Sequence, residues 1–191
     1  MSFLTSTSFA ELSTNRLLLQ RPCLKDANDY HRILSCPEIS RYSDIPHNPT
    51  KKRSERFVSW ISKLHVRGTG IGWIVKLRHS NKTIGSVRIN RIEKKARCGI
   101  LGYEIHPDHW NTGYATEALG VIVDHSHGAM ELNRLEAWTT IGNQASEKVL
   151  LNNGFQYEGT QRSKAKFGDQ LWDIRLFGRL AADDHRYQES D

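Results

Sequence analysis

One stretch of the sequence combines a glycine, small residues and the start of a helix in a way that suits the binding of an anion. It reads Gly-Tyr-Glu-Ile-His-Pro-Asp-His-Trp-Asn-Thr-Gly-Tyr-Ala-Thr-Glu-Ala over residues 102–118, and it predicts a strand, a short loop and a helix that begins at Gly113. Gly113 and Ala115 have little side-chain bulk, so an anionic group can approach the backbone. The free N–H groups of residues 111–116 and the positive end of the helix dipole would then bind a pyrophosphate, with roughly 0.3–1 kcal/mol per contact.

The loop also fits a second interpretation. It is not the phosphate loop of nucleotide-binding proteins, which would place Lys and Ser or Thr directly after its second glycine, whereas Tyr114 and Ala115 follow Gly113 here. The same residues suit a tight turn at which the helix begins and nothing binds. The loop alone therefore leaves open whether this is an anion site or a structural turn.

Hydrophobic periodicity predicts the elements that must position this loop. The expected strands cover residues 16–21, 73–77, 83–92, 97–106 and 135–140, followed by a hairpin of residues 155–167 and 170–177. The expected helices cover residues 26–35, a segment after the N-cap Thr50, residues 113–127, and residues 144–152 after the N-cap Asn143. This order predicts a single α/β domain with a mixed sheet and helices on both faces, over residues 14–180. Residues 1–13 are expected to be a flexible lead and residues 181–191 a polar tail. The tryptophans on apolar faces are expected to fill the core: Trp60, Trp73, Trp138 and Trp172.

Composition excludes several classes of protein. The chain has 191 residues, of which 38% are hydrophobic and 25% charged, as is typical of one globular domain. Its longest mainly apolar run, Ala118–Val123, is far shorter than the roughly 18 residues that a membrane helix needs. Residues 1–12 show no features of a signal peptide, and Cys23, Cys36 and Cys98 lack the CxxC spacing of a zinc or redox site. We therefore expect reduced thiols, a cytoplasmic location and no membrane role.

The net charge of +6 favours polyanionic partners, but it does not choose among nucleic acid, ribosomes and phosphorylated cofactors. The basic run Lys51-Lys-Arg53, with Arg56, lacks interleaved aromatic residues, so we expect a solvated helix face and no direct role in nucleic-acid binding. The nine histidines show no HxxxH or Cys/His grouping, which predicts no metal site.

Further motifs make the sequence identifiable. His109-Trp-Asn-Thr-Gly-Tyr-Ala-Thr-Glu-Ala118 resembles the acetyl-CoA loop of the GNAT superfamily of N-acetyltransferases, and other motifs of that family follow in the same order. These are Asn15-Arg-Leu-Leu-Leu-Gln-Arg-Pro22, Ile84-Gly85, Gly102-Tyr103 with His106-Pro107, Asn143-Gln-Ala-Ser146, and Asn153-Gly-Phe155 with Glu158-Gly159. The set is similar to the RimJ/RimL branch, which acetylates the N-termini of ribosomal proteins, and the resemblance covers about residues 14–180.

This resemblance implies a twisted, mostly antiparallel sheet that splits beside the strand ending at His106. The pantetheine arm of acetyl-CoA would fill the gap like an added strand. Main-chain contacts to that arm would come from Glu104, Ile105 and His106. The pyrophosphate would be held by the backbone of Asn111, Thr112, Gly113, Tyr114, Ala115 and Thr116. Asn143 matches the residue whose side chain meets the pantetheine, and this role is compatible with that of a helix N-cap.

The general base is where this chain departs from the family. Many relatives carry a glutamate two residues before the Gly-Tyr pair, and that position is Ile100 here. Because strand side chains alternate, Glu104 shares a face with Ile100 and would lie close to the acetyl group. Glu104 is therefore the first candidate for the base, acting directly or through water, and His106 is the reserve. The alternative is that Glu104 is an ordinary carboxylate that contacts substrate or solvent.

The proton donor to the leaving thiolate is also unusual. Many members of the superfamily use a tyrosine four residues before the glycine of the Gly-Phe pair, and that position is Leu150 here. Ser146 matches the serine of the ribosomal branch and would hydrogen-bond the sulfur. Its alternative is a serine on the helix surface without a catalytic role. Positioning alone can also supply much of the rate, since effective molarities are large.

The sequence therefore predicts an enzyme that moves the acetyl group of acetyl-CoA to a primary amine by direct attack in a ternary complex. The expected acceptor is a protein N-terminus. A small amine, such as an antibiotic or an amino acid, and a non-catalytic acetyl-CoA-binding protein are the alternatives. The loop Pro37–Pro49, the helix after Thr50 and the final hairpin would select the acceptor, and an acidic pocket around Glu104, Glu158 and Asp173 would favour a cationic one. Both a monomer and a homodimer fit the sequence.

Overall fold

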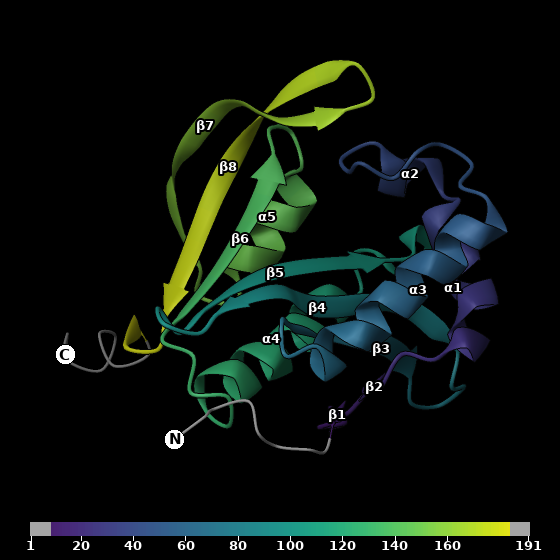
Figure 1. Cartoon of the computed structure of the whole chain (residues 1–191), viewed down its shortest axis with the longest axis horizontal. Coiled ribbons are helices and arrows are strands. Elements are labelled where there is room, and N and C mark those ends of the chain that lie inside the picture. The colour runs from purple at the N-terminus through teal and green to yellow at the C-terminus, as the bar shows by residue number, and fades with distance from the viewer. Residues whose placement is uncertain (1–8, 184–191) are drawn as a thin grey trace.

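The computed structural model describes residues 9–183, which fold around one eight-stranded sheet with strand order β1-β2-β3-β4-β5-β6-β8-β7 (Figure 1). The strands are β1 (Leu12–Ser13), β2 (Leu17–Gln20), β3 (Ile71–Leu77), β4 (Thr83–Glu93), β5 (Cys98–Ile105), β6 (Arg134–Thr140), β7 (Gln156–Phe167) and β8 (Gln170–Leu180). The α-helices are α1 (Ala27–Leu34), α2 (Pro37–Ser40), α3 (Lys51–Val66), α4 (Tyr114–His127) and α5 (Gln144–Leu151). Short 3₁₀ turns, η1 (Leu24–Asp26) and η2 (Pro107–His109), precede α1 and follow β5.

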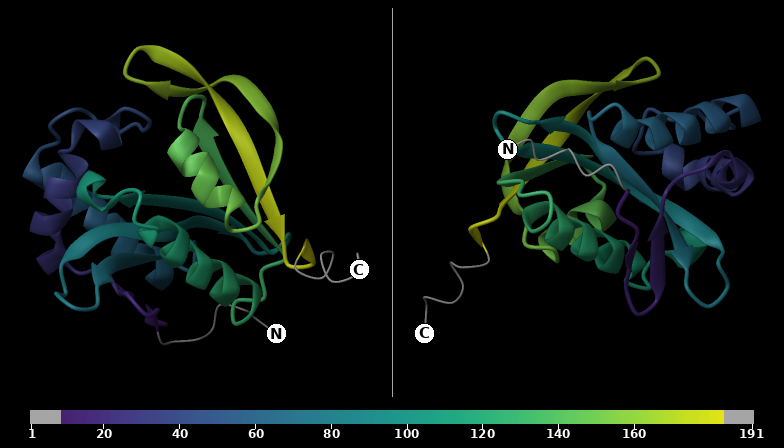
Figure 2. Two further views of the ribbon diagram at one scale, coloured as in Figure 1. Left: turned by 180° about the vertical axis from the view of Figure 1, so that it is seen from behind. Right: turned by 60° about the horizontal axis from the view of Figure 1, so that its bottom comes forward.

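Helices cover the two faces of the sheet with separate apolar clusters. Along β3, Ile74 packs with the buried side chains of α1 and α3, whereas its neighbours Trp73 and Val75 pack on the other face with α4. This follows from the alternation of strand side chains, and it produces the two-sided arrangement in Figure 2. The predicted α/β fold with helices on both faces is confirmed. Among the described residues, no helix is both long and apolar enough to cross a bilayer.

The sheet splits between β5 and β6. These strands are parallel and pair only at Cys98↔Arg134, Gly99↔Leu135 and Ile100↔Glu136. Beyond Ile100, β5 continues to Ile105 with β4 as its strand partner, while β6 continues beside β8. The two strands therefore diverge like a fork in Figure 1, and among the described residues no strand pairs with this edge of residues 101–105. This is the split that the family resemblance implies.

Three expectations about the elements need correction. Residues 12 and 13, assigned to a flexible lead, form β1 and pair with β2, and the Trp73 indole donates a hydrogen bond to the Ala10 carbonyl oxygen at 2.7 Å. The remaining lead (residues 1–8) and most of the expected tail (184–191) lie outside the described residues. Trp73 is fully buried as expected, but Trp60 and Trp138 are 37% and 44% exposed. Trp138 is exposed because the neighbouring buried residues of β6 face α5, and its own side chain points the other way.

Gly85 sets how closely β4 and β5 can pair. A Cβ atom at this position would lie 2.1 Å from the Glu104 carbonyl oxygen and 3.0 Å from the Ile105 Cα atom. Backbone atoms of a paired strand cannot yield as a flexible side chain does. We therefore expect Gly85→Ala to lower the free energy of unfolding by about 3 kcal/mol, measured by urea denaturation.

Gly99→Ala on β5 is the matched control. The three atoms nearest to its Cβ atom would belong to the side chains of Ile89, Leu132 and Leu135, at 3.0–3.2 Å, so we expect a loss of about 1 kcal/mol. An equal loss from the two substitutions would contradict a special constraint at Gly85.

Candidate active site

The loop before α4 presents a row of unbonded backbone amides. Gly113 adopts the left-handed conformation (φ 82°, ψ 0°) and caps the helix, and the first helical hydrogen bond runs from the Glu117 N–H to its carbonyl oxygen at 3.0 Å. Within the described part of the chain, the amides of residues 111–116 donate no hydrogen bond. Six free donors at the positive end of a 14-residue helix are the arrangement that suits an anion.

Arg16, just before β2, holds this loop against the sheet. Its guanidinium donates to the Thr112 carbonyl oxygen at 3.0 Å, pairs with the Glu117 carboxylate at 2.5 Å, and lies 4.5 Å from the centre of the Tyr114 ring. Arg16 was not among the predicted site residues, although it belongs to one of the motifs that carried the family resemblance. That motif was the only feature of the sequence that pointed to Arg16, since no spacing rule connects residue 16 with residue 112.

The unpaired edge of β5 presents main-chain groups to the fork. The His106 N–H donates to the Ile84 carbonyl oxygen at 2.7 Å, and because antiparallel pairs alternate, the N–H and C=O groups of Tyr103 and Ile105 point away from β4. The Ile105 carbonyl oxygen accepts a hydrogen bond from the Trp110 indole at 2.6 Å. The His106 carbonyl oxygen accepts one from the His109 N–H at 2.9 Å. The N–H and C=O groups of His106, which was expected to offer main-chain contacts to a donor, therefore already have partners, whereas those of Tyr103 face the fork.

Glu104 lies in a buried polar cluster on the face covered by α1 and α3. Its Oε1 atom is 2.6 Å from the Arg88 guanidinium and accepts a hydrogen bond from the Ser86 hydroxyl at 2.5 Å. The Ser86 oxygen is in turn 2.8 Å from the Tyr30 hydroxyl. Within the described chain, both bonds to Glu104 go to Oε1, which leaves Oε2 for a water molecule or an amine.

Burial dominates the electrostatics of this cluster. It raises the pKa of Glu104 well above the ordinary value for glutamate, and the adjacent Arg88 charge opposes the shift. Burial also lowers the pKa of Arg88 to about 10, so that Arg88 stays cationic at neutral pH. The guanidinium lies 5.0 Å from the Phe57 ring centre and 5.9 Å from that of Trp60, both on α3. Glu104 thus combines a raised proton affinity with a fixed position, as a general base requires.

His106, the reserve candidate for the base, has both ring nitrogens engaged. Its Nδ1 accepts a hydrogen bond from the Asp108 N–H at 3.2 Å, and its Nε2 lies 3.4 Å from the Cys36 sulfur. Both nitrogens therefore already have partners within the described chain. Glu104 is therefore the stronger candidate of the two.

Ser146 and Asn143 meet at the start of α5, on the other face of β5 from Glu104. The Asn143 side-chain oxygen accepts a hydrogen bond from the Ser146 N–H at 3.2 Å, so the predicted N-cap is confirmed. The Ser146 hydroxyl lies 2.7 Å from the hydroxyl of Tyr103, which also donates to the Ser146 carbonyl oxygen at 3.0 Å. Tyr103 was not predicted as a site residue, since its Gly-Tyr motif gives no indication of a partner 43 positions away.

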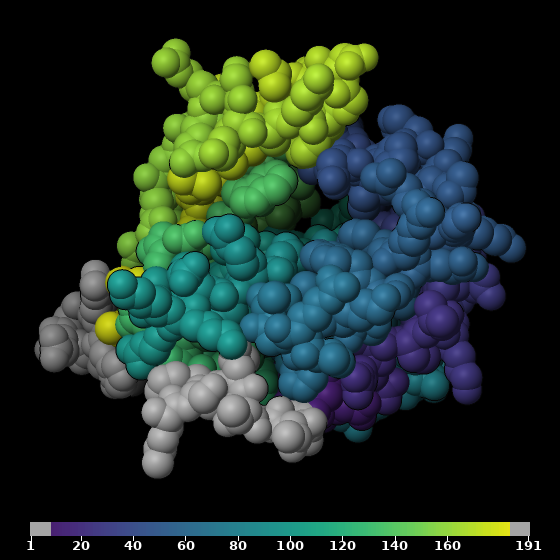
Figure 3. All heavy atoms as spheres, viewed as in Figure 1, coloured from purple at the N-terminus to yellow at the C-terminus, as the bar shows by residue number. Residues whose placement is uncertain are grey.

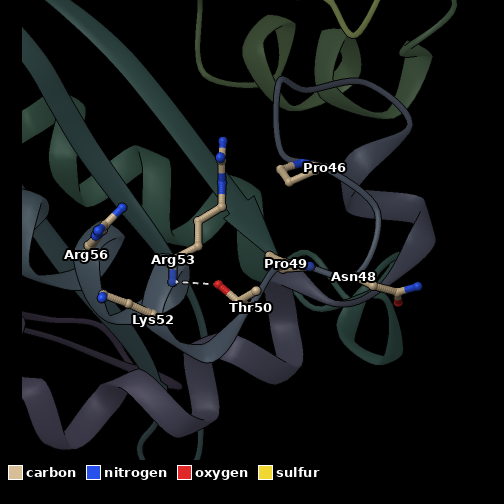
Figure 4. Close-up of a pocket in the computed structure, with 7 residues that line it drawn as sticks. All are labelled: Pro46, Asn48, Pro49, Thr50, Lys52, Arg53 and Arg56. Atoms are coloured by element: carbon tan, nitrogen blue, oxygen red, sulfur yellow. Dashed lines mark hydrogen bonds between the residues drawn. The ribbon is translucent and has the colours of Figure 1, made fainter.

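The segments that were expected to select the acceptor surround a hollow. Figure 3 shows a hollow between the β7–β8 hairpin and the segment of α2 and α3. At the start of α3, a pocket of about 310 Å³ is lined by Lys52, Arg53 and Arg56 together with Pro46, Asn48, Pro49 and Thr50 (Figure 4). The expected acidic pocket is not assembled: Glu158 pairs with Arg134 at the closed end of the fork, and Asp173 accepts a hydrogen bond from the Ser163 N–H.

Comparisons with known proteins agree with this geometry. The sequence profile of the acetyltransferase (GNAT) domain matches residues 16–156. The uncharacterized N-acetyltransferase YoaA of Bacillus subtilis is 30% identical over 154 residues, which cover 81% of this chain and 87% of YoaA. The ribosomal-protein-serine acetyltransferase of Escherichia coli is 28% identical over 117 residues, which cover 61% of this chain and 64% of that protein.

Solved structures share the fold. Mycobacterium smegmatis RimJ in complex with CoA-disulfide superposes with a TM-score of 0.77 at 22% identity, covering 90% of this chain and 88% of RimJ. The GNAT domain match spans well over half of the sequence, and the fork, the free amides and the family motifs occur together within it. The chain therefore belongs to the GNAT family of acetyltransferases.

Proposed function

We propose that this protein transfers the acetyl group of acetyl-CoA to the amino group of a protein N-terminus. The observation that supports it most directly is the row of unbonded amides at residues 111–116, beside the unpaired edge of β5. A pyrophosphate joined to a slender amide-bearing arm matches both features. The similarity to a ribosomal-protein-serine acetyltransferase supports an N-terminal acceptor.

The donor would be bound mainly by the backbone. The amides of Asn111, Thr112, Gly113, Tyr114, Ala115 and Thr116 hold the pyrophosphate, and Arg16 keeps their loop in place. The pantetheine arm pairs with the main-chain groups of Tyr103, and the Asn143 side chain contacts it from the start of α5. Such an arm binds like an added strand.

Consecutive residues of β5 place the two chemical roles on opposite sides of the thioester. Glu104 faces α1 and α3, whereas Tyr103 faces α5 and Ser146. The acceptor reacts as the neutral amine: its lone pair attacks the acetyl carbonyl carbon, and the proton that its nitrogen then carries in excess passes to Glu104 Oε2, directly or through water. The Ile105 N–H stabilises the oxyanion that forms. The C–S bond then breaks, its electron pair goes to sulfur, and the thiolate leaves on the Ser146 side.

The charge around the hollow bears on the acceptor. The pocket at the start of α3 carries three basic side chains, and none of these forms a salt bridge within the described residues. A polycationic acceptor would be repelled there. A small amine remains the second candidate, because Glu104 and the donor site would serve it equally.

The test is a thiol-release assay with acetyl-CoA and matched acceptors: short peptides with free N-termini, the same peptides with blocked N-termini, and a panel of small amines. We expect turnover only with free peptide N-termini, and a mass increase of one acetyl group on the α-amine. Preferential turnover of small amines would replace the proposed acceptor. Saturable acetyl-CoA binding without thiol release would instead indicate a non-catalytic acetyl-CoA-binding protein.

A further inference from the structure

We infer that Tyr103 is a positioning residue that directs the Ser146 hydroxyl toward the sulfur of the acyl donor and thereby stabilises the departing thiolate. The inference rests on the proposed function, since it concerns the leaving group of that reaction. It assigns a role to a buried hydroxyl group that the mechanism above does not use.

The Tyr103 hydroxyl has Ser146 as its hydrogen-bonding partner within the described chain. It lies 2.7 Å from the Ser146 Oγ atom and 3.0 Å from the carbonyl oxygen of the same residue. Tyr103 is on β5 directly beside Glu104, and its own backbone faces the fork in which the donor arm would lie. The tyrosine therefore connects the unpaired strand edge with the first turn of α5.

Counting protons gives this contact two forms. A phenol has one proton, so Tyr103 donates either to the Ser146 carbonyl oxygen or to Ser146 Oγ. In the first form Ser146 donates back to Tyr103, and its proton is occupied. In the second form Tyr103 donates to Oγ, and the serine proton is free to point at a third atom. The two forms interconvert by rotation of two hydroxyl groups, without movement of any heavier atom.

A leaving thiolate favours the second form, in which Tyr103 donates to Ser146 Oγ and the serine proton is free. As the C–S bond breaks, its electron pair moves to sulfur, and the Ser146 O–H donates a hydrogen bond to the new charge. Tyr103 supports this by donating to Oγ, since chained hydrogen bonds strengthen one another. No proton is transferred: burial raises the pKa of Tyr103 well above the ordinary value, so the phenol keeps its proton. The proton of the amine is bound by Glu104 on the opposite face.

The helix cap does not explain the contact. Asn143 already accepts the Ser146 N–H at 3.2 Å and thus caps α5 without the tyrosine. Replacement of the Tyr103 hydroxyl should therefore leave α5 in place and act on the Ser146 side chain.

The first experiment measures steady-state kinetics of Tyr103→Phe with acetyl-CoA and the best peptide acceptor. We expect kcat to fall about 10-fold, as for the loss of one supporting hydrogen bond to a charged system, with KM for acetyl-CoA unchanged. Tyr157→Phe is the matched control, because Tyr157 is 46% exposed and its hydroxyl, within the described residues, forms a hydrogen bond with Thr160 alone. It should keep the wild-type kcat.

A double-mutant cycle with Ser146→Ala separates positioning from a general structural effect. If Tyr103 acts through the serine hydroxyl, Tyr103→Phe should have no further effect on kcat once that hydroxyl is absent. Effects of the two substitutions that multiply would overturn the inference, as would an unchanged kcat in Tyr103→Phe.

A second measurement needs no acceptor. The thiol of free CoA has a pKa of roughly 8.5, and a hydrogen bond to the thiolate lowers it. We expect the pKa of enzyme-bound CoA, followed by the ultraviolet absorbance of the thiolate, to lie below that of free CoA. Tyr103→Phe should raise the pKa of bound CoA by about one unit.

These readouts distinguish the possible failures. Bound CoA with the same thiol pKa in wild type and Tyr103→Phe would overturn the role of Tyr103 and leave the proposed function standing. Absence of saturable CoA binding would overturn the proposed function itself, and this inference with it.

Discussion

Gly113→Asp should weaken the binding of acetyl-CoA at least 100-fold, which corresponds to about 2.7 kcal/mol. The measurement is a titration of acetyl-CoA by isothermal calorimetry at fixed ionic strength. Two physical effects add at this position. Gly113 has φ 82°, a conformation that costs an L-residue about 1 kcal/mol, and the new carboxylate would be attached in the middle of the row of amides of residues 111–116.

The second effect is electrostatic and larger. A carboxylate about 4 Å from a phosphate oxygen costs about 4 kcal/mol at the effective dielectric constant of a protein surface. The new side chain would also accept hydrogen bonds from the amides that should bind the pyrophosphate. Space is not the obstacle, because a Cβ atom would meet only the end of the Arg16 side chain, at 3.4 Å.

Gly168→Asp supplies the matched control for this substitution. Gly168 also has a positive φ, 57°, in the β7–β8 turn, and a Cβ atom there meets nothing within 4 Å. It introduces the same charge and a similar backbone strain far from the amide row, so the affinity for acetyl-CoA should stay at the wild-type value. Gly113→Ala should show the strain alone, a loss of about fivefold. Wild-type affinity in Gly113→Asp would refute the assignment of this loop to the pyrophosphate.

Glu104→Gln should lower kcat about 100-fold while KM for acetyl-CoA changes little. The amide cannot take a proton from the acceptor amine, but the proposed donor contacts come from backbone groups and Asn143. The substitution also leaves the Arg88 guanidinium buried without its counter-charge, so folding must be checked by urea denaturation before the rates are compared.

The pH dependence of kcat tests the same role. A general base acts in its deprotonated form, and burial raises the pKa of Glu104. The wild-type rate should therefore fall as the pH is lowered through that raised pKa, and Glu104→Gln should lose this part of the profile. The pH profile of Glu104→Gln should then show only the titration of the acceptor amine. The midpoint of this titration should shift when an amine with a different pKa is used.

Glu158→Gln is the control for loss of an arginine-paired glutamate. Glu158 pairs with Arg134 through a half-exposed contact at the closed end of the fork. Its replacement should change kcat less than twofold, since exposed ion pairs contribute roughly 0–1 kcal/mol. A wild-type pH profile in Glu104→Gln would exclude Glu104 as the base.

The sequence allowed most of this fold to be predicted, because α3, α4 and α5 begin at recognisable residues and the strands alternate. Thr50 and Asn143 cap α3 and α5 as expected, and Gly113 begins α4. The fork between β5 and β6 was predictable only through family resemblance, since no local pattern specifies where a sheet should remain unpaired.

The polar contacts of the site were beyond sequence reasoning. Glu104 meets Arg88 only through the register of β4 against β5, which shifts between Ile89 and Arg91. Tyr103 meets Ser146 across 43 positions of the chain. Alternation correctly placed Glu104 on the face of Ile100, but it gave no information on the loop that closes around His106 and uses its backbone groups.

The fork also places an unpaired strand edge where it is protected from aggregation. A bare edge normally invites pairing with another chain and hence aggregation. Here the bare edge lies inside the molecule: β6 joins β5 at the base, and the Trp110 indole caps the Ile105 carbonyl oxygen near the open end. A second protein strand would have to wedge between two diverging arms of one sheet. The fork thus leaves this unpaired backbone open to a narrow ligand, such as the proposed pantetheine arm, and closed to a strand of a second protein chain.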